Sequence, residues 1–182
     1  MTIGITVEPH VKKKVASVIA QWADAPVKWH PVDGLHVPLV SLGWVHDDDV
    51  STVIAAVRDV AAQTAMCDVV FTRIAAGHKD PHVTDPAHYN VVRLEGEASV
   101  PLRKLHEKLH HALHMPYTPK KQFRPFVTLG QMRAGQWRAD AHRPQIAVPV
   151  HLVMDVTHVS VLEHVEENGA WTFVPYDLAP LV

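Results

Sequence analysis

The hydrophobic positions of the chain recur with two different spacings, and the wider spacing indicates helices. Apolar side chains that are three or four positions apart share one face of a helix. This spacing predicts helices over residues 9–22, 47–61 and 100–114. The apolar positions of the first are Val11, Val15, Val18, Ile19 and Trp22, and those of the second are Val53, Ile54, Val57, Val60 and Ala61. The third has Leu102, Leu105, Leu109 and Leu113. Asp47, Asp48 and Asp49 open the second helix, where we expect them to cap it and to complement its dipole.

Shorter apolar runs predict strands. They lie near residues 3–7, 35–42, 67–74, 89–95, 148–154, 158–165 and 171–174, and many are rich in valine, which favours extended backbone. Asn168 and Gly169 separate the last two runs, and both residues tolerate the positive φ of a tight hairpin turn. The pattern begins β-α-β-α and ends in strands, so it predicts an α+β protein.

The chain shows no low-complexity segment and no long linker. Its 182 residues are 47% hydrophobic and 20% charged, a composition typical of one globular unit. We therefore expect residues 1–182 to form a single domain with two lobes packed on a shared core.

The charge balance limits the partners of the protein. A formal charge of −2 argues against an extended nucleic-acid surface, which needs a basic excess to neutralise phosphates. Any contact with nucleic acid is therefore expected to be local.

Cysteine usage and the apolar runs favour a cytoplasmic protein. Cys67 is the single cysteine, so it cannot form an internal disulfide, and its place at the start of a predicted strand favours a packing role over that of a nucleophile. The first residues are apolar and are followed by Glu8 and three lysines, the reverse of a signal peptide. No apolar run reaches membrane-spanning length, and we expect no membrane contact.

Two short segments resemble each other and carry the candidate chemistry. The first is Leu35-His36-Val37-Pro38-Leu39 and the second is Pro125-Phe126-Val127-Thr128-Leu129. Their equivalent positions, 36 and 126, are 90 residues apart. Residues i and i+2 of a strand point to the same face, so a His-x-Thr triplet presents an imidazole and a hydroxyl together. The first segment keeps His36 but has Pro38 at the hydroxyl position. The second keeps Thr128 but has Phe126 at the imidazole position.

These segments and their flanks resemble the two motifs of the two-histidine (2H) phosphoesterase superfamily. The first motif has an aromatic residue, a loop, Leu-His-x-Thr-Leu, Leu-Gly and an acidic stretch, which is similar to Trp29, residues 35–39, Leu42-Gly43 and residues 47–49. The second motif, Phe-x-Pro-His-x-Thr-Leu, is similar to residues 123–129. The resemblance covers nearly the whole chain and is to the 2'-5' RNA ligase-like (LigT-like) proteins, also called RNA 2',3'-cyclic phosphodiesterases.

This resemblance implies a fold and an activity. The fold has two pseudo-symmetric lobes, each an antiparallel sheet with helices packed outside, around a central cleft. The activity is hydrolysis of 2',3'-cyclic phosphates or 2'-5' ligation, without a metal or another cofactor, on an RNA end or a cyclic nucleotide. Carried over to this chain, the resemblance assigns acid–base chemistry to His36 and hydrogen bonding of the phosphoryl oxygens to Thr128.

The two altered positions bear directly on that activity. A missing general acid or base typically costs on the order of 10²–10⁴ in rate, so Phe126 leaves catalytic competence open. Pro38 lacks a hydroxyl and a backbone N–H, and proline is tolerated in sheets chiefly at edges or bulges. The family often has an arginine shortly after the second motif, where this chain has Gln131 and then Arg133.

Nearby basic and aromatic residues are candidates for substrate binding. Arg124, with Lys121 and Lys120 before it, could bind phosphate, because an arginine presents a bidentate donor fork; the alternative is a solvated loop. Trp29 and Trp44 bracket the first motif and could stack on a base, or they could pack at the wall of the cleft.

Two groups of histidines offer further alternatives. His78, His82 and His88 lie in one polar loop and could supply a substitute imidazole, although the chain has 15 histidines and local enrichment is weak evidence. His106, His110 and His114 recur every four residues and could chelate a metal. The simpler interpretation is a surface row beside a buried leucine stripe, and we expect no metal.

Two hypotheses follow. The protein is a divergent 2H phosphoesterase that acts on RNA or nucleotide 2',3'-cyclic phosphates through His36 and Thr128. Alternatively, it is a non-catalytic family member that binds a nucleotide or RNA end, or serves as a scaffold.

Overall fold

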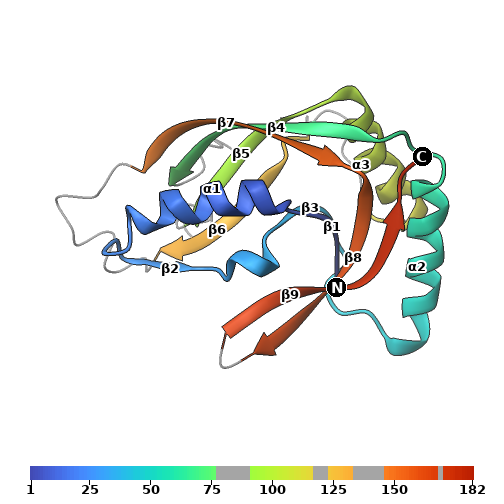
Figure 1. The fold of residues 1–182 in the computed structure, drawn as a ribbon. Coiled ribbons are helices and arrows are strands. Elements are labelled where there is room, and N and C mark those ends of the chain that lie inside the picture. The colour runs from blue at the N-terminus through green and yellow to red at the C-terminus, as the bar shows by residue number, and fades with distance from the viewer. Residues whose placement is uncertain (77–90, 117–122, 133–145, 168–169) are drawn as a thin grey trace.

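The computed structural model describes residues 1–76, 91–116, 123–132, 146–167 and 170–182. It is an α+β structure with two antiparallel sheets and few helices, as predicted (Figure 1). The elements are β1 (Thr2–Thr6), α1 (Pro9–Ala20), β2 (Val27–Trp29), the 3-10 helix η1 (Val32–Gly34), β3 (His36–Ser41), α2 (Asp47–Ala61), β4 (Cys67–Ala76), β5 (Val91–Ala98), α3 (Val100–Ala112), β6 (Phe126–Met132), β7 (Ala147–Val156), β8 (His158–Glu167) and β9 (Ala170–Pro180).

The predicted helices and strands are confirmed, with ends that move by a few residues. Two short elements, β2 and η1, were not predicted, since three residues are too few for a periodic pattern. The predicted aspartate cap of α2 was wrong. The N-cap residue is His46, whose side chain makes no capping hydrogen bond, and the three aspartates lie in the first turn, where they complement the helix dipole.

The two sheets do not correspond to successive halves of the chain. The four-stranded sheet has the order β3-β1-β8-β9, and the five-stranded sheet has the order β2-β6-β5-β4-β7. The C-terminal hairpin β8–β9 therefore completes the sheet that contains the first motif, whereas β2 joins the sheet that contains the second. Among the described strands, the chain crosses between the sheets four times: through α1, η1 and α2, and last at Thr157, the one residue between β7 and β8.

The predicted hairpin is present. Glu167 pairs with Ala170 at the end of the β8–β9 ladder, while Asn168 and Gly169 lie outside the described residues.

The hydrophobic core joins both sheets and all three helices. The buried apolar residues form one contiguous cluster, in which Val37 of β3 and Val127 of β6 are almost fully buried. Helices α2 and α3 pack against each other, α2 also contacts β8 and β9, and α3 contacts β3 and β4. This places α2 and α3 on one side of the molecule (Figure 1).

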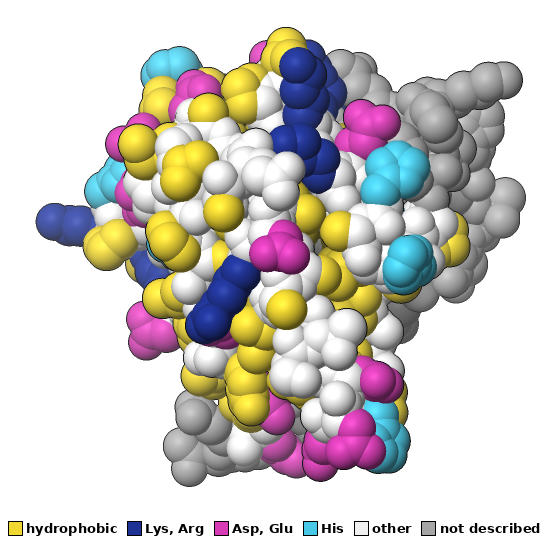
Figure 2. Space-filling view, turned by 90° about the vertical axis from the view of Figure 1, so that its right-hand side faces the viewer, with side chains coloured by type: hydrophobic (Ala, Val, Ile, Leu, Met, Phe, Trp, Pro, Cys, Tyr) yellow, Lys and Arg dark blue, Asp and Glu magenta, His cyan; other side chains and the backbone are white. Residues whose placement is uncertain are grey.

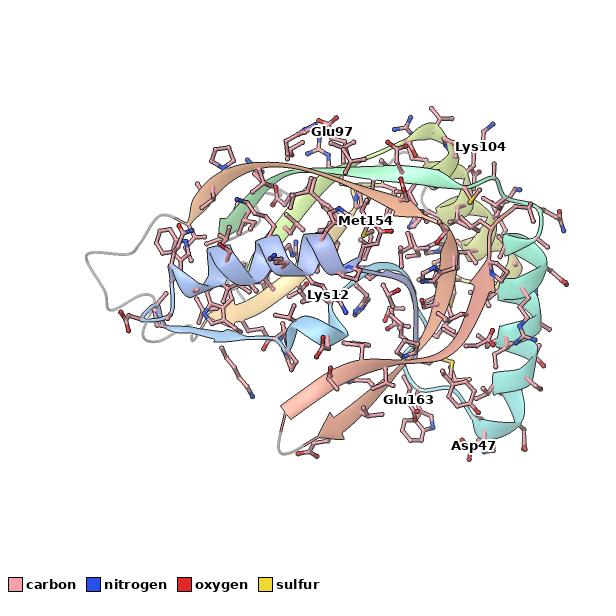
Figure 3. All side chains as sticks on the ribbon, viewed as in Figure 1. Lys12, Asp47, Glu97, Lys104, Met154 and Glu163 are labelled. Carbon is pink, nitrogen blue, oxygen red and sulfur yellow. The ribbon has the colours of Figure 1, made fainter. Side chains whose placement is uncertain are left out.

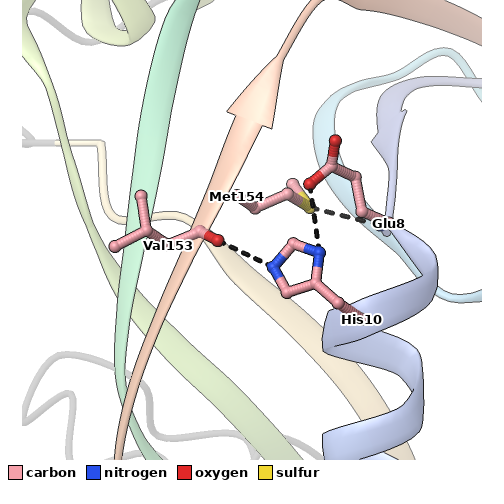
Figure 4. A network of polar contacts seen from close by, with 4 residues as sticks. All are labelled: Glu8, His10, Val153 and Met154. Carbon is pink, nitrogen blue, oxygen red and sulfur yellow. Dashed lines mark hydrogen bonds and ion pairs between the residues drawn. The ribbon is translucent and has the colours of Figure 1, made fainter.

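The start of α1 is anchored to the five-stranded sheet (Figure 4). His10 donates from Nε2 to the carbonyl oxygen of Val153 on β7 at 2.9 Å, and the backbone N–H of Glu8 points at Sδ of Met154 at 3.5 Å. The helix that follows β1 in one sheet is thus bonded to β7 of the other. Figure 3 shows Met154 beside the first turns of α1.

Within the described ranges, no helix combines the length and the apolar character needed to cross a membrane.

Candidate functional site

The two motif strands have matching backbone pairings. β3 pairs with β1, and β6 pairs with β5, in the same order of contacts. The equivalent pairs are Thr6↔His36 and Glu95↔Phe126; Ile5↔Val37 and Leu94↔Val127; Gly4↔Pro38 and Arg93↔Thr128; Ile3↔Val40 and Val92↔Gly130. One residue is skipped in each ladder, Leu39 in β3 and Leu129 in β6, so each motif strand carries a bulge after its third motif position.

Alternation along these strands separates a core face from a polar face. Val37 and Val127 point into the core with their strand partners Ile5 and Leu94. Residues directly opposite in a ladder share a face, which leaves the flanking positions on the other side. We call this surface the motif face and define it by His36, Pro38, Thr6 and Gly4 in one sheet and by Phe126, Thr128, Glu95 and Arg93 in the other. β3 and β6 come within 8 Å of each other between Cα atoms, so the two halves of the motif face are neighbours.

His36 is held in a defined orientation and tautomer. Its Nδ1 donates to the carbonyl oxygen of Gly34 at 3.0 Å, so Nε2 carries the lone pair in the neutral ring. The ring lies beside Gly4, since a Cβ on Gly4 would stand 3.2 Å from Cδ2 of His36. Burial lowers the pKa of His36, the bond to Gly34 opposes this, and nearby His30 and His164 lower it further. The imidazole is therefore neutral at pH 7 and suited to act as a base.

Pro38 lies where a sheet tolerates proline. β3 is an edge strand of its sheet, and Pro38 stands next to the bulged Leu39. The expectation that proline occupies an edge or a bulge is confirmed, because both conditions hold at this position.

His30 follows β2 and is bonded to the second motif strand. Its backbone N–H donates to the carbonyl oxygen of Leu129 at 2.8 Å, which extends the pairing of β2 with β6 by one residue. Burial lowers the pKa of His30, followed by the positive charges of Lys28 and His164. Since His30 also lowers the pKa of His36, the two imidazoles lie within electrostatic range of each other.

The β8–β9 hairpin folds over the first motif. The ring of Phe173 lies 4.3 Å from that of His36 and stacks at 4.6 Å on His164. A Cβ on Gly34 would stand 3.0 Å from the backbone nitrogen of Phe173, so the hairpin passes close to the loop before β3. Phe173 thus covers one side of the His36 ring.

The second motif presents an arginine in place of a histidine. The guanidinium of Arg93 lies over the ring of Phe126 at 4.4 Å, and Arg93 stands opposite Thr128 in the ladder. Glu95, opposite Phe126, forms an ion pair with Arg73 at 2.6 Å. Burial lowers the pKa of Arg93, with an opposing contribution from Glu95.

The structure brings together only some of the residues predicted to bind substrate. Trp29 packs against the core, and a Cβ on Gly130 would stand 3.0 Å from Cε3 of its ring. Trp44 is 94% exposed and follows the far end of β3, about 17 Å from His36 at 3.3 Å per residue. Arg124 is exposed directly before β6, while Lys121 lies outside the described residues. For Trp29, the structure shows packing against the core.

Of the two alternative groups of histidines, the first lies outside the described residues, and the second has described ring contacts with Phe123 and within the group. His78, His82 and His88 lie outside the described residues. His106 stacks on Phe123 at 4.1 Å and contacts the ring of His110, and burial, then His110, lowers its pKa to about 4. In the described part of the chain, no three His, Cys, Asp or Glu residues are grouped closely enough to hold a metal ion.

His30, His164, Phe173 and Arg93 were missed by the sequence analysis. His30 directly follows the aromatic residue of the first motif. Arg93 and Glu95 alternate with buried Leu94, a pattern that indicates a strand with a polar face. His164 and Phe173 had no local signal, because the curl of their hairpin brings them to His36.

Comparisons with known proteins agree with this architecture. A family model described as the 2'-5' RNA ligase superfamily matches residues 3–168. The chain therefore belongs to the 2'-5' RNA ligase superfamily, of the 2H phosphoesterases. No curated protein matches the sequence.

Solved structures share the fold at low sequence identity. TT0787 of Thermus thermophilus superposes with a TM-score of 0.75 and 18% identity over 99% of this chain and 96% of its own. E. coli LigT complexed with 3'-AMP gives a TM-score of 0.69 and 16% identity over 99% and 96% of the two chains. LigT complexed with phosphate gives 0.72 and 14% over 99% and 95%. The predicted LigT-like fold is confirmed.

Proposed function

We propose that this member of the 2'-5' RNA ligase superfamily hydrolyses 2',3'-cyclic phosphates at RNA ends or on nucleotides. The observation that carries the proposal is the orientation of His36, whose Nδ1–H is bonded to Gly34 and whose Nε2 is left as the basic atom. Its lowered pKa keeps this atom unprotonated at neutral pH, as a general base requires.

The general acid in this proposal is His30. A cyclic phosphate needs a proton donor for its leaving oxygen as well as a base for the attacking water, and Phe126 cannot supply one. His30 is bonded to the residue after Thr128 and is electrostatically coupled to His36. Two neighbouring imidazoles repel each other when both are charged, so the pair resists a second proton, and burial makes the first proton harder to bind as well. The singly protonated pair contains one acid and one base.

The reaction then balances as a simple hydrolysis. His36 takes a proton from water, and the water oxygen forms a bond to phosphorus. The bond from phosphorus to one ribose oxygen breaks, and His30 gives its proton to that oxygen. Thr128 donates a hydrogen bond to a phosphoryl oxygen. The product is a nucleoside or RNA end that carries a phosphate monoester.

The surface charge favours a small local ligand. On the face drawn in Figure 2, the Lys and Arg side chains of the described residues are scattered among hydrophobic, acidic and histidine side chains and form no continuous basic field. E. coli LigT has been solved with phosphate and with 3'-AMP, which are ligands of this size. An RNA end or a cyclic nucleotide is therefore the partner that we propose.

A non-catalytic role is the second candidate, and Phe126 is the observation that favours it. If His30 cannot act as an acid, the same surface binds a nucleotide or RNA end without turnover. The two candidates differ in product formation alone.

The test is hydrolysis of the four nucleoside 2',3'-cyclic phosphates, and of an RNA ending in a cyclic phosphate, by the purified protein. Chromatography of the products would show turnover that disappears in His36→Ala. The exposed His10 provides a matched control, and His10→Ala should keep wild-type rates. Absence of product from every substrate, together with tight binding of 3'-AMP, would replace the enzymatic proposal by the binding role.

A further inference from the structure

Arg93 is a partly buried cation with little to compensate it. Its Nε is buried, and among the described residues it has no hydrogen-bond partner. Burying such a donor without a partner is unfavourable. Glu95, the carboxylate of the described residues that acts on the pKa of Arg93, is engaged by Arg73 at 2.6 Å. The guanidinium therefore retains donors and positive charge for a further ligand.

Phe126 fixes the position of this guanidinium. The cation lies 4.4 Å from the ring centroid, within the distance at which an aromatic face attracts arginine. An imidazole at position 126 would lose this attraction whenever it became protonated. A phenyl ring keeps it at every pH.

Thr128 adds a neutral donor next to the cation. Opposite residues in an antiparallel ladder have Cβ atoms about 4.5–5.5 Å apart, and Arg93 and Thr128 are such a pair. A phosphoryl group has several oxygens, so it can accept from both side chains at once. The fork of an arginine fits two of these oxygens.

We propose that Arg93 and Thr128 form a binding site for a phosphoryl group, with Phe126 as the platform that positions Arg93. The site takes inorganic phosphate and the phosphate of a nucleotide, and it does not require a nucleobase. This inference rests on the proposed function for the statement that the bound group is the substrate's phosphate. On this basis, Phe126 marks a conversion of the second motif from acid–base chemistry to anion binding.

The experiment is a titration of the intact protein with inorganic phosphate, 3'-AMP and adenosine. Calorimetry would give the dissociation constants, and the Nε–Hε resonance of Arg93 in NMR spectra would report its own contact. We expect phosphate and 3'-AMP, but not adenosine, to shift this resonance. Arg93→Gln should weaken the binding of phosphate and 3'-AMP by on the order of 10–100-fold, and Arg93→Lys, which lacks the fork, should fall between.

Matched variants separate this site from a general charge effect. Lys104→Gln removes the same charge from the exposed side of α3 (Figure 3) and should bind phosphate as the wild type does. Phe126→Leu should weaken phosphate binding several-fold, because it removes the aromatic platform, and Phe126→Tyr should restore it. Circular dichroism and thermal unfolding would show that each variant is folded.

The outcomes distinguish this inference from the proposed function. Unchanged phosphate affinity in folded Arg93→Gln, or no phosphate binding by the wild type, would overturn the inference even if cyclic phosphates are hydrolysed. Arg93-dependent phosphate binding without turnover of any cyclic phosphate would support the anion site and reject the enzymatic proposal.

Discussion

The two motif strands combine the same backbone with different side chains. β3 and β6 share their pairing order and their bulge, yet β3 presents an imidazole and a proline, whereas β6 presents a phenyl ring and a threonine hydroxyl. Opposite them, Gly4 stands where the other ladder has Arg93. The register of both strands is set by buried partners on the core face, such as Val37 and Val127. The polar face can therefore change its chemistry without changing the fold.

The difference also assigns separate tasks to the two strands. The first strand orients a base through its backbone bond to Gly34, and the second holds a cation on an aromatic ring. The imidazole that we propose as the acid near the second strand belongs to His30, which lies outside the motif.

Removing the imidazole of the first strand should have the largest effect. We expect His36→Ala to lower kcat/KM for 2',3'-cyclic AMP by on the order of 10²–10⁴, because the general base is lost. In the wild type, kcat/KM should rise with pH as His36 loses its proton and fall again as His30 loses its own; because both pKa values are lowered, the maximum should lie below pH 6.5. Activity of His36→Ala near that of His10→Ala would show that the first strand is not the catalytic one.

Removing the imidazole of His30 should lower the rate about as much as removing a motif histidine. We expect His30→Gln to lower kcat by on the order of 10², with little change in KM, because it removes the proton donor. Adding Phe126→His to this variant should recover part of the rate by returning an imidazole to the second strand. Steady-state kinetics of the single and double variants would measure the recovery. If His30→Gln is as active as the wild type, the acid lies elsewhere.

Gly4 and Arg93 occupy equivalent positions, and only Gly4 has no room for a side chain. A Cβ there would stand 2.7 Å from the carbonyl oxygen of Val37 and 3.2 Å from His36. We expect Gly4→Ala to lower the free energy of unfolding by about 1–3 kcal/mol and to reduce activity by displacing His36. Urea unfolding and kinetics would check both effects. Gly43→Ala provides a contrast. An alanine at the φ of +68° found at this position would be strained, but its Cβ would meet no atom within 4 Å, so activity should be kept.

The loss of folding stability in acid should come from His106 of helix α3 rather than from the motif face. His106 has a pKa of about 4 in the folded protein, against about 6.5 when unfolded. The unfolded chain therefore binds more protons between these values, and stability should fall as the pH drops from 6.5 to 4. His106→Phe should flatten this dependence while keeping the stack on Phe123. Thermal unfolding across this pH range would measure it, and an unchanged slope would assign the sensitivity to other groups, such as His30 and His36.

Returning a hydroxyl to the first strand should have the smallest effect. Pro38 lies on an edge strand beside a bulge, so we expect Pro38→Thr to change stability by no more than about 0.5 kcal/mol. An added hydrogen bond worth about 1 kcal/mol would raise phosphate affinity roughly fivefold. Calorimetry would detect this gain. A large loss of stability would mean that the proline holds the bulge in place.

Much of the fold could be predicted from local patterns. Leu102, Leu105 and Leu109 recur at helical spacing, and all are fully buried on α3. The alternating strands and the hairpin between β8 and β9 were similarly recognisable. β2 could not be predicted, because a three-residue strand owes its existence to pairing with β6 rather than to its own sequence.

The candidate site was only partly predictable. His36 and Thr128 stand in recognisable motifs, and their altered partners Pro38 and Phe126 were visible as well. Arg93 gains its significance from a ladder that places it opposite Thr128. Trp44 was weighed as a base-stacking residue because it is close to His36 in sequence, although the length of β3 separates them.

The family, the helices, most strands and the altered motif positions can be recognised from the sequence, because they depend on local spacing and side-chain type. Which strands share a sheet and which residues meet is set by the tertiary structure. The β8–β9 hairpin returns to the sheet of β1 and β3 and brings Phe173 onto His36, and β2 joins the other sheet and brings His30 to Leu129 of the second motif strand. Such contacts between distant segments follow from the joint burial of apolar faces, which no local pattern encodes.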